Sequence, residues 1–264
     1  MTPVEPIVLK IAETTLCIDS VRQMLDLLGA PEYEEQKNIY RQKPGEALIE
    51  IAGRLCYRSY NTEINPNVTK IRNSSLEYFE NTLSKGDGSI FEHASVTFAF
   101  LNVSRVFTHE LVRHRVGVAI SQESMRYVRL DNGINFWVPP GTPENILRIM
   151  EEAVNHAFET YRMLTRSEQW DTLSMHEKKA LTSLFRRILP DGIATNIIWT
   201  SNIRNLRHVI EMRTDPSAEI EMRIVFNKVA NIMKNSYPNI FNDFVTIEQP
   251  DGPPAWTSVL RRKV

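Results

Sequence analysis

Residues 104–127 read SRVFTHELVRHRVGVAISQESMRY, and the rest of the chain is interpreted outward from this stretch. Ser104 is a residue type favoured at a helix N-cap. The apolar positions behind it have the spacing of a short amphipathic helix, namely Val106, Phe107, Leu111 and Val112. We therefore expect a helix that ends at Arg113-His114-Arg115 and a loop that begins near Gly117.

The same stretch is dense in polar side chains, because Ser121-Gln122-Glu123-Ser124-Met125-Arg126-Tyr127 follows the basic triplet. Arginine binds phosphate or carboxylate bidentately, histidine changes protonation near neutral pH, and serine and glutamine can hydrogen-bond the edge of a heterocycle. These residue types indicate an anion site. Cations at a helix C-terminus also complement the helix dipole, so this cluster alone does not decide the matter.

A second polar cluster favours the ligand interpretation. Asn202, Arg204, His208 and Arg213 follow a buried strand, and positions 204 and 208 share one stripe of a helix. Two such clusters exceed what dipole compensation needs. Burying either would be costly unless a polyanionic ligand or another subunit completed it.

Composition limits the classes of protein that remain. The 264 residues are 42% hydrophobic and carry a formal net charge of -1, which is ordinary for a soluble globular protein and unlike a non-specific nucleic-acid binder. Cys17 and Cys56 are far apart, which suits a reducing compartment. We see no signal peptide and no apolar run long enough to span a membrane, so we expect a cytoplasmic protein.

The remaining patterns predict an α+β fold in one domain, residues 1–264, with a central, mostly antiparallel sheet flanked by long helices. The tail 245–264 is expected to be extended and partly ordered, because it holds three prolines. Strands are expected within 7–18, 95–100, 134–138 and 195–200. Helices are expected over 21–28, 47–57, from Asn65-Pro66 to Leu83, from Thr142-Pro143 onward, from the capping box Ser174–Glu177 to Leu189, over 202–213, and from Asp215-Pro216 onward.

Two familiar motifs are excluded by spacing. His109 and His114 are five residues apart, roughly 140° around a helix axis, whereas a zinc-protease helix needs histidines four apart. We therefore expect no metal site. The turn Lys85-Gly86-Asp87-Gly88-Ser89 lacks the pattern of a phosphate-binding loop.

Taken together, these residues resemble the flavin-dependent thymidylate synthases. Arg113-His114-Arg115, followed by Ser-Gln-x-Ser-x-Arg-Tyr ending at Tyr127, is similar to that family's signature. The likeness covers residues 52–225 and extends to Phe91-Glu92-His93, to Leu189-Pro190 with Thr195, to Thr200-x-Asn202-x-Arg204-x-Leu206, and to Arg213 with Ala218-Glu219-x-Glu221.

The chain departs from the family pattern at four places. Eight residues separate Arg115 from Ser124 where the usual motif has seven. Asp87 stands where a histidine is often found, and Glu110 where a glutamine is common. Asn196 replaces an arginine that in many members helps to hold the nucleotide phosphate.

The resemblance implies binding of FAD, conversion of dUMP to dTMP with the methylene group of methylenetetrahydrofolate, and NADPH as the reductant. It also implies a homotetramer with FAD between subunits, without nucleic acid or membrane as partners. Carried over by position, the FAD contacts are Ser89, Arg113, His114, Arg115, Gln122, Asn202, Arg204 and His208. The dUMP contacts are Glu110, Arg113, Gln122, Glu123, Ser124, Met125, Arg126 and Arg213.

Arg213 is the expected catalytic residue, because methylation of uracil at C5 requires charge to build on the ring and a fixed guanidinium would stabilise it. Cys17 and Cys56 lie outside the polar clusters, so no enzyme thiol is expected to attack the ring. Ser124 has no evident base beside it and is expected to hydrogen-bond the phosphate or ribose. Two alternatives stay open from the residues alone: a non-catalytic nucleotide- or RNA-binding module, and another FAD-dependent reductase.

Overall fold

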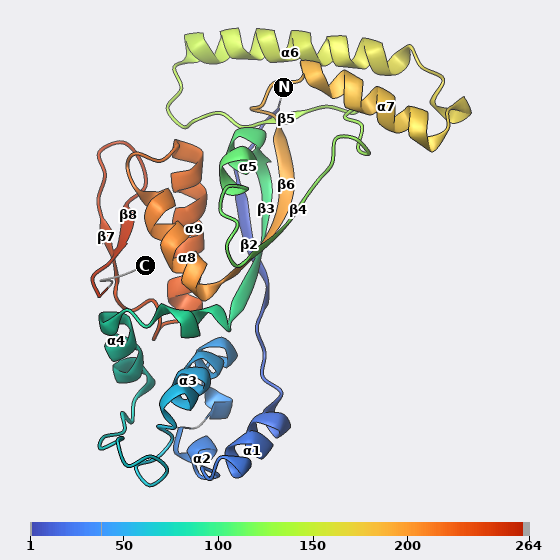
Figure 1. Ribbon diagram of the computed structural model, residues 1–264. Helices are drawn as coiled ribbons and strands as arrows, with labels where there is room; N and C mark the ends of the chain where they lie inside the picture. The colour runs from blue at the N-terminus through green and yellow to red at the C-terminus, as the bar shows by residue number, and fades with distance from the viewer. Residues whose placement is uncertain (1, 38, 261–264) are drawn as a thin grey trace. The chain divides into compact units, whose positions relative to one another are not determined.

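The computed structural model describes residues 2–37 and 39–260, and this part of the chain contains both helices and strands (Figure 1). The strands are β1 Thr2–Pro3, β2 Ile7–Glu13, β3 Ser95–Ser104, β4 Val118–Gln122, β5 Asn135–Phe136, β6 Ala194–Asn202, β7 Phe244–Ile247 and β8 Ala255–Ser258. The helices are α1 Ile18–Leu27, α2 Tyr33–Lys37, α3 Pro44–Tyr57, α4 Ser75–Lys85, α5 Arg105–Leu111, α6 Glu144–Arg166, α7 Met175–Phe185, α8 Ile203–Thr214 and α9 Ile220–Ser236.

The main sheet has four strands in the order β2-β3-β6-β4. Two smaller sheets accompany it: β1 pairs with β5 in parallel, and β7 pairs with β8 in antiparallel register. The predicted α+β class, with an antiparallel sheet flanked by helices, is confirmed.

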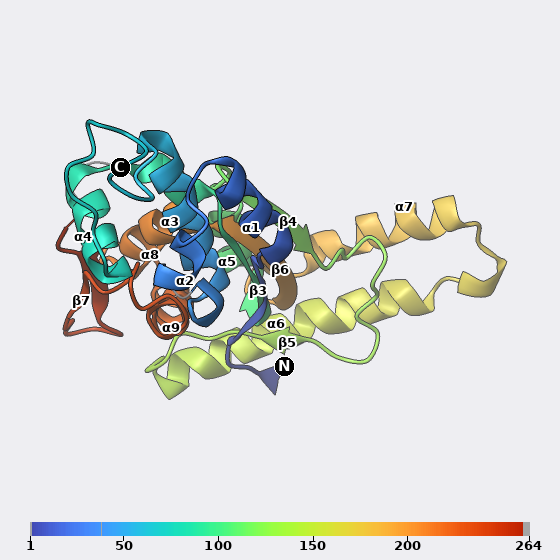
Figure 2. The same cartoon turned by 90° about the horizontal axis from the view of Figure 1, so that it is seen from below.

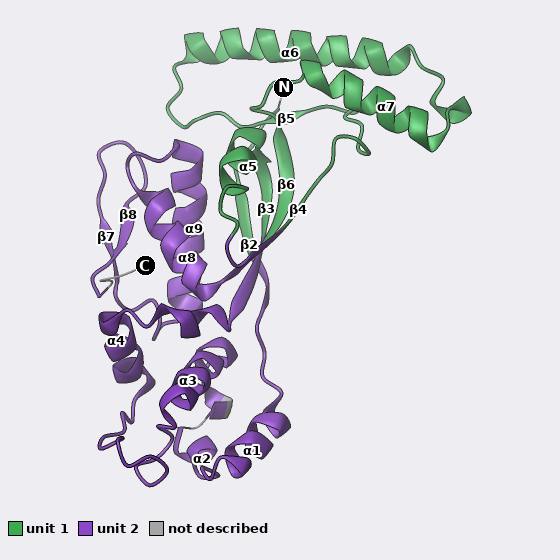
Figure 3. Cartoon of the chain, in the orientation of Figure 1, with its two compact units in different colours: residues 1–9, 99–115, 120–199 green, residues 10–98, 116–119, 200–264 purple. Residues whose placement is uncertain are grey.

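The chain divides into two compact units, coloured separately in Figure 3. Unit 1 comprises residues 1–9, 99–115 and 120–199, and unit 2 comprises 10–98, 116–119 and 200–264. The division falls within β2, β3, β4 and β6, so strands of one sheet contribute to both units. That the whole chain acts as one domain stays a prediction.

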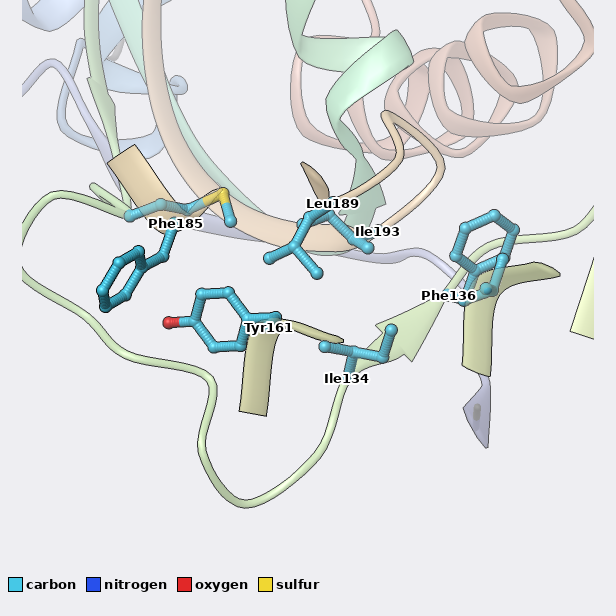
Figure 4. Packing of buried hydrophobic residues seen from close by; sticks show 8 residues of the cluster. Ile134, Phe136, Tyr161, Phe185, Leu189 and Ile193 are labelled. Atoms are coloured by element: carbon cyan, nitrogen blue, oxygen red, sulfur yellow. The ribbon is translucent and has the colours of Figure 1, made fainter. Parts of the chain in front are cut away.

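In unit 1, α6 and α7 lie beside each other (Figures 1 and 2) and contribute side chains to the same apolar cluster. Figure 4 shows Tyr161 of α6 between Phe185, Leu189 and Ile134. The start of α7 is fixed locally by the predicted capping box, because the Ser174 hydroxyl accepts from the Glu177 amide and the Glu177 carboxylate accepts from the Ser174 amide. Burial of apolar side chains and the capped N-terminus of α7 together stabilise the α6–α7 pair.

The N-terminal part of unit 2 buries a charged network among α2, α3 and α4. Glu50 accepts from Arg54 at 2.7 Å and from the Ser75 hydroxyl at 2.6 Å, and Lys37 lies 3.4 Å from the same carboxylate. The Tyr33 hydroxyl also points at Glu50, and burial raises the pKa of Tyr33 well above its usual range. Each buried charge is therefore hydrogen-bonded, as buried charges must be.

The C-terminal part of unit 2 is built on α8. Arg207 donates to both oxygens of Asp243, at 2.9 and 2.7 Å, and its guanidinium lies over the Phe244 ring at a centroid distance of 4.7 Å. The β7–β8 hairpin is tied to the same helix, because the Ser258 amide donates to Glu211 at 2.8 Å. The β7–β8 hairpin therefore packs against α8.

Four sequence expectations differ from the structure. Asn65-Pro66 does not start a helix: Asn65 Oδ1 accepts from the Asn67 amide in a turn, and α4 begins at Ser75 with Ser74 as its cap. Asp215 closes a turn with Ser217, and Glu219 caps α9 instead. The strand expected over 134–138 is only two residues long. The partly ordered tail contains the hairpin, and residues 261–264 lie outside the described residues.

Within the described ranges, no helix combines the length and the apolar character that crossing a bilayer requires.

We predict that Asp243→Ala lowers the free energy of unfolding by about 3–5 kcal/mol, because it leaves the Arg207 charge buried without its partner. The side chains of Arg207 and Asp243 are only 9% and 1% exposed. Urea denaturation of the purified protein measures the change. Glu159→Ala, which removes the largely exposed partner of Arg162 on α6, is the matched control and should cost less than about 1 kcal/mol. Equal losses in the two variants would contradict this account.

Candidate functional site

The basic triplet of unit 1 lies where the sequence predicts it, at the end of α5. The Ser104 hydroxyl caps this helix by accepting from the Phe107 amide at 3.0 Å. The helix closes with the His114 amide donating to Leu111, which leaves Arg113 and Arg115 exposed and His114 half-buried. Neither Arg113 nor Arg115 has an ion pair among the described residues. Two guanidinium groups at this helix end are thus available to an anion.

The loop after β4 is held in place by its own backbone. Ser124 accepts from the Tyr127 amide through its carbonyl and from the Arg126 amide through its hydroxyl. The Arg126 carbonyl accepts from the Thr182 hydroxyl of α7 at 2.7 Å, while its guanidinium stays exposed. Met125 is buried in the core of unit 1. The loop thus buries one side chain and presents its neighbours to solvent.

Gln122 and Glu110 lie on either side of the basic triplet in the sequence. Gln122 is half-buried and donates to the Thr108 hydroxyl of α5 at 3.3 Å, so it connects the loop to the helix before the triplet. Glu110 is half-buried on the same helix. Unit 1 therefore brings together most of the residues predicted to contact dUMP.

Asn196, at the position where the family pattern has an arginine, forms hydrogen bonds with two other segments of unit 1. Asn196 Nδ2 donates to Glu123 Oε2 at 2.7 Å, and Asn196 Oδ1 accepts from the Asn102 amide at 3.1 Å. The Glu123 amide in turn donates to the Asn196 carbonyl at 2.9 Å. The asparagine is a connector between β3, β6 and the loop.

Sequence reasoning missed a group of arginines in unit 1. Burial and the neighbouring charges of Arg105, Arg126 and Arg187 lower the pKa of Arg186 below its usual range. Among the described residues, none of these four arginines forms a salt bridge. Arg186-Arg187 stands just before Leu189-Pro190, and a doublet of arginines beside that motif was the available signal. Such a cluster is suited to a phosphate.

In unit 2, Asn202 joins β6 to α8. Its side chain accepts from the Asn205 amide at 2.8 Å as the helix N-cap, and its own amide donates to the Gly117 carbonyl at 3.0 Å. Gly117 has φ +67°, and a Cβ at this position would lie 2.0 Å from Asn202 Nδ2. Only glycine at this position leaves room for the Asn202 side chain and adopts the positive φ without strain.

Arg204 follows in the first turn of α8. Its guanidinium donates to Glu92 of the Phe91-Glu92-His93 motif at 2.5 Å. A Cβ on Gly88 would lie 3.0 Å from Arg204 Nε, so the backbone before Ser89 passes directly over this side chain. Ser89 itself is exposed and lines a cavity of about 460 Å³ that also includes Tyr57, Arg72, Lys85 and Asp87. The structure therefore brings Arg204 and the turn 88–92 together.

The other predicted residues of α8 are not on one face. His208 borders a second cavity, of about 670 Å³, between this helix and the C-terminal hairpin. Arg213 is nine positions after Arg204, which places the two roughly 180° apart around the axis at 3.6 residues per turn. Arg213 therefore does not join the Arg204 cluster. In the described ranges, no three His, Cys, Asp or Glu residues are grouped as metal ligands would be.

Comparison with known proteins gives a consistent result. Residues 39–239 match the family described as thymidylate synthase complementing protein. Flavin-dependent thymidylate synthases of Mycolicibacterium vanbaalenii and Mycobacterium avium are each 34% identical to this chain, over 227 and 222 residues. These alignments cover 83% and 82% of this chain and 88% and 86% of the relatives.

A solved structure shares the fold. It is the UMP/dUMP methylase PolB from Streptomyces cacaoi, crystallised with 5-Br dUMP, with a TM-score of 0.63 and 18% identity. The match covers 91% of this chain and 95% of that one.

We predict that Gly117→Ala destabilises unit 2 more than a glycine replacement with the same backbone strain elsewhere. Gly141 has φ +78° and open space where a Cβ would lie, with nothing within 4 Å, so Gly141→Ala bears only the strain of left-handed backbone. The clash with Asn202 should add about 1–3 kcal/mol to the loss for Gly117→Ala. Denaturant titrations of the two variants measure the difference, and equal losses would show that the close approach has no energetic weight.

Proposed function

The chain belongs to the family of flavin-dependent thymidylate synthases, and we propose from this premise that it converts dUMP to dTMP with methylenetetrahydrofolate as the carbon donor. The observation that carries the proposal is the uncompensated arginine cluster of unit 1, which adjoins the loop 122–126. A dianionic nucleotide phosphate would supply the missing negative charge. The family match favours neither a non-catalytic nucleotide- or RNA-binding module nor another FAD-dependent reductase.

The residues present fit FAD. A pyrophosphate needs cations and close backbone approach, and the exposed guanidinium groups of Arg113 and Arg115 together with the glycine turn over Arg204 are of that kind. We propose Ser89, Arg113, His114, Arg115, Gln122, Asn202, Arg204 and His208 as the residues that would hold it. The bound flavin, reduced by NADPH, would supply the hydride that the methylation consumes.

For the nucleotide, we assign the phosphate to the arginine cluster. Arg126 and Arg186 each present a guanidinium that can bind phosphate oxygens bidentately, and Arg105 lies close enough for Nη1 to reach the Met125 sulfur at 3.5 Å. This cluster replaces the arginine that the family pattern places at position 196. The remaining proposed dUMP contacts are Glu110, Arg113, Gln122, Glu123, Ser124, Met125 and Arg213.

Arg213 is proposed as the catalytic residue. A guanidinium aimed at the uracil carbonyl and ring nitrogen would stabilise the negative charge that develops as C5 attacks the methylene carbon. No thiol is needed for this step. Cys17 and Cys56 are both exposed, Cys17 just before α1 and Cys56 near the end of α3, and neither is near the arginine cluster in sequence.

The positions of Arg204 and Arg213 on α8 support a site shared between copies of the chain. Arg204 and Arg213 lie on opposite sides of this helix. A single site that faces one side of α8 can therefore contact only one of them from the same copy of the chain. The strand β2 also exposes Ile7, Leu9 and Ile11 by 44–50%, a stripe of apolar side chains that a second copy could cover. We therefore propose a homotetramer with FAD between subunits. Two free cysteines suit the reducing cytoplasm, where we place the enzyme.

We predict that the purified protein releases tritium from 5-labelled dUMP only when methylenetetrahydrofolate and NADPH are both present. The Cys17→Ala/Cys56→Ala double variant should retain this activity within about threefold, because neither thiol takes part. Flavin absorbance of the same samples reports that each binds its cofactor. Absence of tritium release from flavin-bound wild type would overturn the proposed function, and loss confined to the double variant would overturn the thiol-free scheme.

We predict that Arg186→Gln raises KM for dUMP by about 10-fold or more, with kcat little changed, because one charge-assisted hydrogen bond to the phosphate is lost. The same substitution removes a charge that Arg105, Arg126 and Arg187 repel, so the unliganded variant should be at least as stable as wild type. Arg166→Gln, at the exposed end of α6, is the control. An unchanged KM would remove Arg186 from the phosphate site.

A further inference from the structure

We propose that Asn196 is a positioning residue that aims the Glu123 carboxylate at the 3′-hydroxyl of the bound nucleotide's sugar. The inference rests on the proposed function, since it needs dUMP at the loop 122–126. It assigns a role to the residue that stands where the family pattern has an arginine.

Asn196 is held so that its amide can face only one way. Its oxygen accepts from the Asn102 backbone amide, a group that can only donate, and its nitrogen therefore faces Glu123 Oε2, which can only accept when ionised. Asn102 has φ +58°, in the left-handed region, and its amide lies 3.1 Å from Asn196 Oδ1. The two partners together fix which end of the carboxamide donates.

Glu123 is consequently fixed at two points. Its backbone amide donates to the Asn196 carbonyl at 2.9 Å, and its side chain accepts from the Asn196 amide at 2.7 Å. A half-buried carboxylate tied at both its backbone and one oxygen has little rotamer freedom left. Such a group can present its remaining oxygen in one direction.

That remaining oxygen, Oε1, receives no hydrogen bond among residues 2–37 and 39–260. An arginine at position 196 could bind both carboxylate oxygens at once in the fork geometry and leave none for a ligand. The shorter, neutral asparagine occupies one oxygen only. Asparagine at position 196 therefore leaves Glu123 Oε1 available as an acceptor.

The nucleotide group that Oε1 would accept from follows from charge. A carboxylate repels the phosphate, which the arginines already bind, so Glu123 must face a donor elsewhere on the nucleotide. In deoxyuridine monophosphate the 3′-hydroxyl of the sugar is the donor nearest to the phosphate along the covalent structure. Glu123 is three residues from Arg126, which suits a contact on the sugar next to the phosphate.

The test compares dUMP with 2′,3′-dideoxyuridine 5′-monophosphate, which lacks only the 3′-hydroxyl, by calorimetric binding and by KM and kcat where turnover occurs. Wild type should bind dUMP about 10-fold more tightly than the analogue, the effect of one hydrogen bond to a charged group. In N196D the donor to Glu123 is lost while an acceptor for the Asn102 amide remains. Its ratio of affinities should fall toward one, with kcat for dUMP changed much less than KM.

The double variant N196D/E123Q restores the hydrogen bond with donor and acceptor exchanged. It should recover a dUMP preference of at least about threefold, which a merely structural role for Asn196 would not produce. Asn231→Asp, at an exposed asparagine whose side chain donates to Asn227 within α9, is the matched control and should keep the wild-type ratio.

Each result of these binding experiments either supports or overturns the proposal. Equal affinity of wild type for the two nucleotides, or an unchanged ratio in N196D, overturns the proposal while dTMP formation by wild type leaves the proposed function intact. If wild type binds neither nucleotide, the proposed function itself fails. Should N196D not fold, E123A keeps the Asn196–Asn102 contact and must by itself abolish the preference for dUMP, and a retained preference there overturns the assignment.

Discussion

The turn from β6 into α8 at Asn202 is the constraint on which unit 2 depends. A strand can pass directly into a helix only if the first free amide groups of the helix find acceptors, and the Asn202 side chain supplies one of them. Its own amide is satisfied by the Gly117 carbonyl, and the space between the two residues admits no side chain on Gly117. The short segment 116–119 and the start of α8 are therefore fixed together. From that point helix geometry alone distributes Arg204, Arg207, His208 and Arg213 around the axis.

Charged residues that stabilise the fold differ from those of the candidate site in whether an opposite charge lies beside them. Glu50 and Arg54, and likewise Arg207 and Asp243, are deeply buried and fully paired, because an unpaired buried charge would cost more than folding could offset. The arginines around Arg186 are less buried. The pKa of Arg186 is lowered by burial and by the positive charges of Arg105, Arg126 and Arg187. Accumulated like charge costs stability in the free protein and is recovered when an anion binds. Under the proposed function, a bound phosphate would relieve the repulsion around Arg186.

Local sequence signals predicted much of the fold, and their failures have physical causes. Ser104 and Ser174 were correctly assigned as caps, because a hydroxyl three residues before a free amide has few other partners. Asn65 failed because the same side chain can close a turn without a helix behind it, and here it does. Asp215 failed for the same reason. A single residue type that serves both turns and caps does not say which one the chain will form.

The candidate site was predictable where its residues are adjacent in sequence and not where they converge from a distance. The triplet at 113–115 lies at a helix end, as its pattern indicates, but the charge around Arg186 arises only when α5, the loop and the end of α7 meet. The contacts of position 196 were also not predictable from the sequence, because its partners are distant in the chain. A family pattern marks the asparagine there as a lost phosphate ligand, whereas the structure gives its amide two partners, Glu123 and Asn102. Under the proposed function, the arginines around Arg186 would supply the charge that position 196 lacks, so the charge of a site has to be judged over the whole cluster of residues and not position by position.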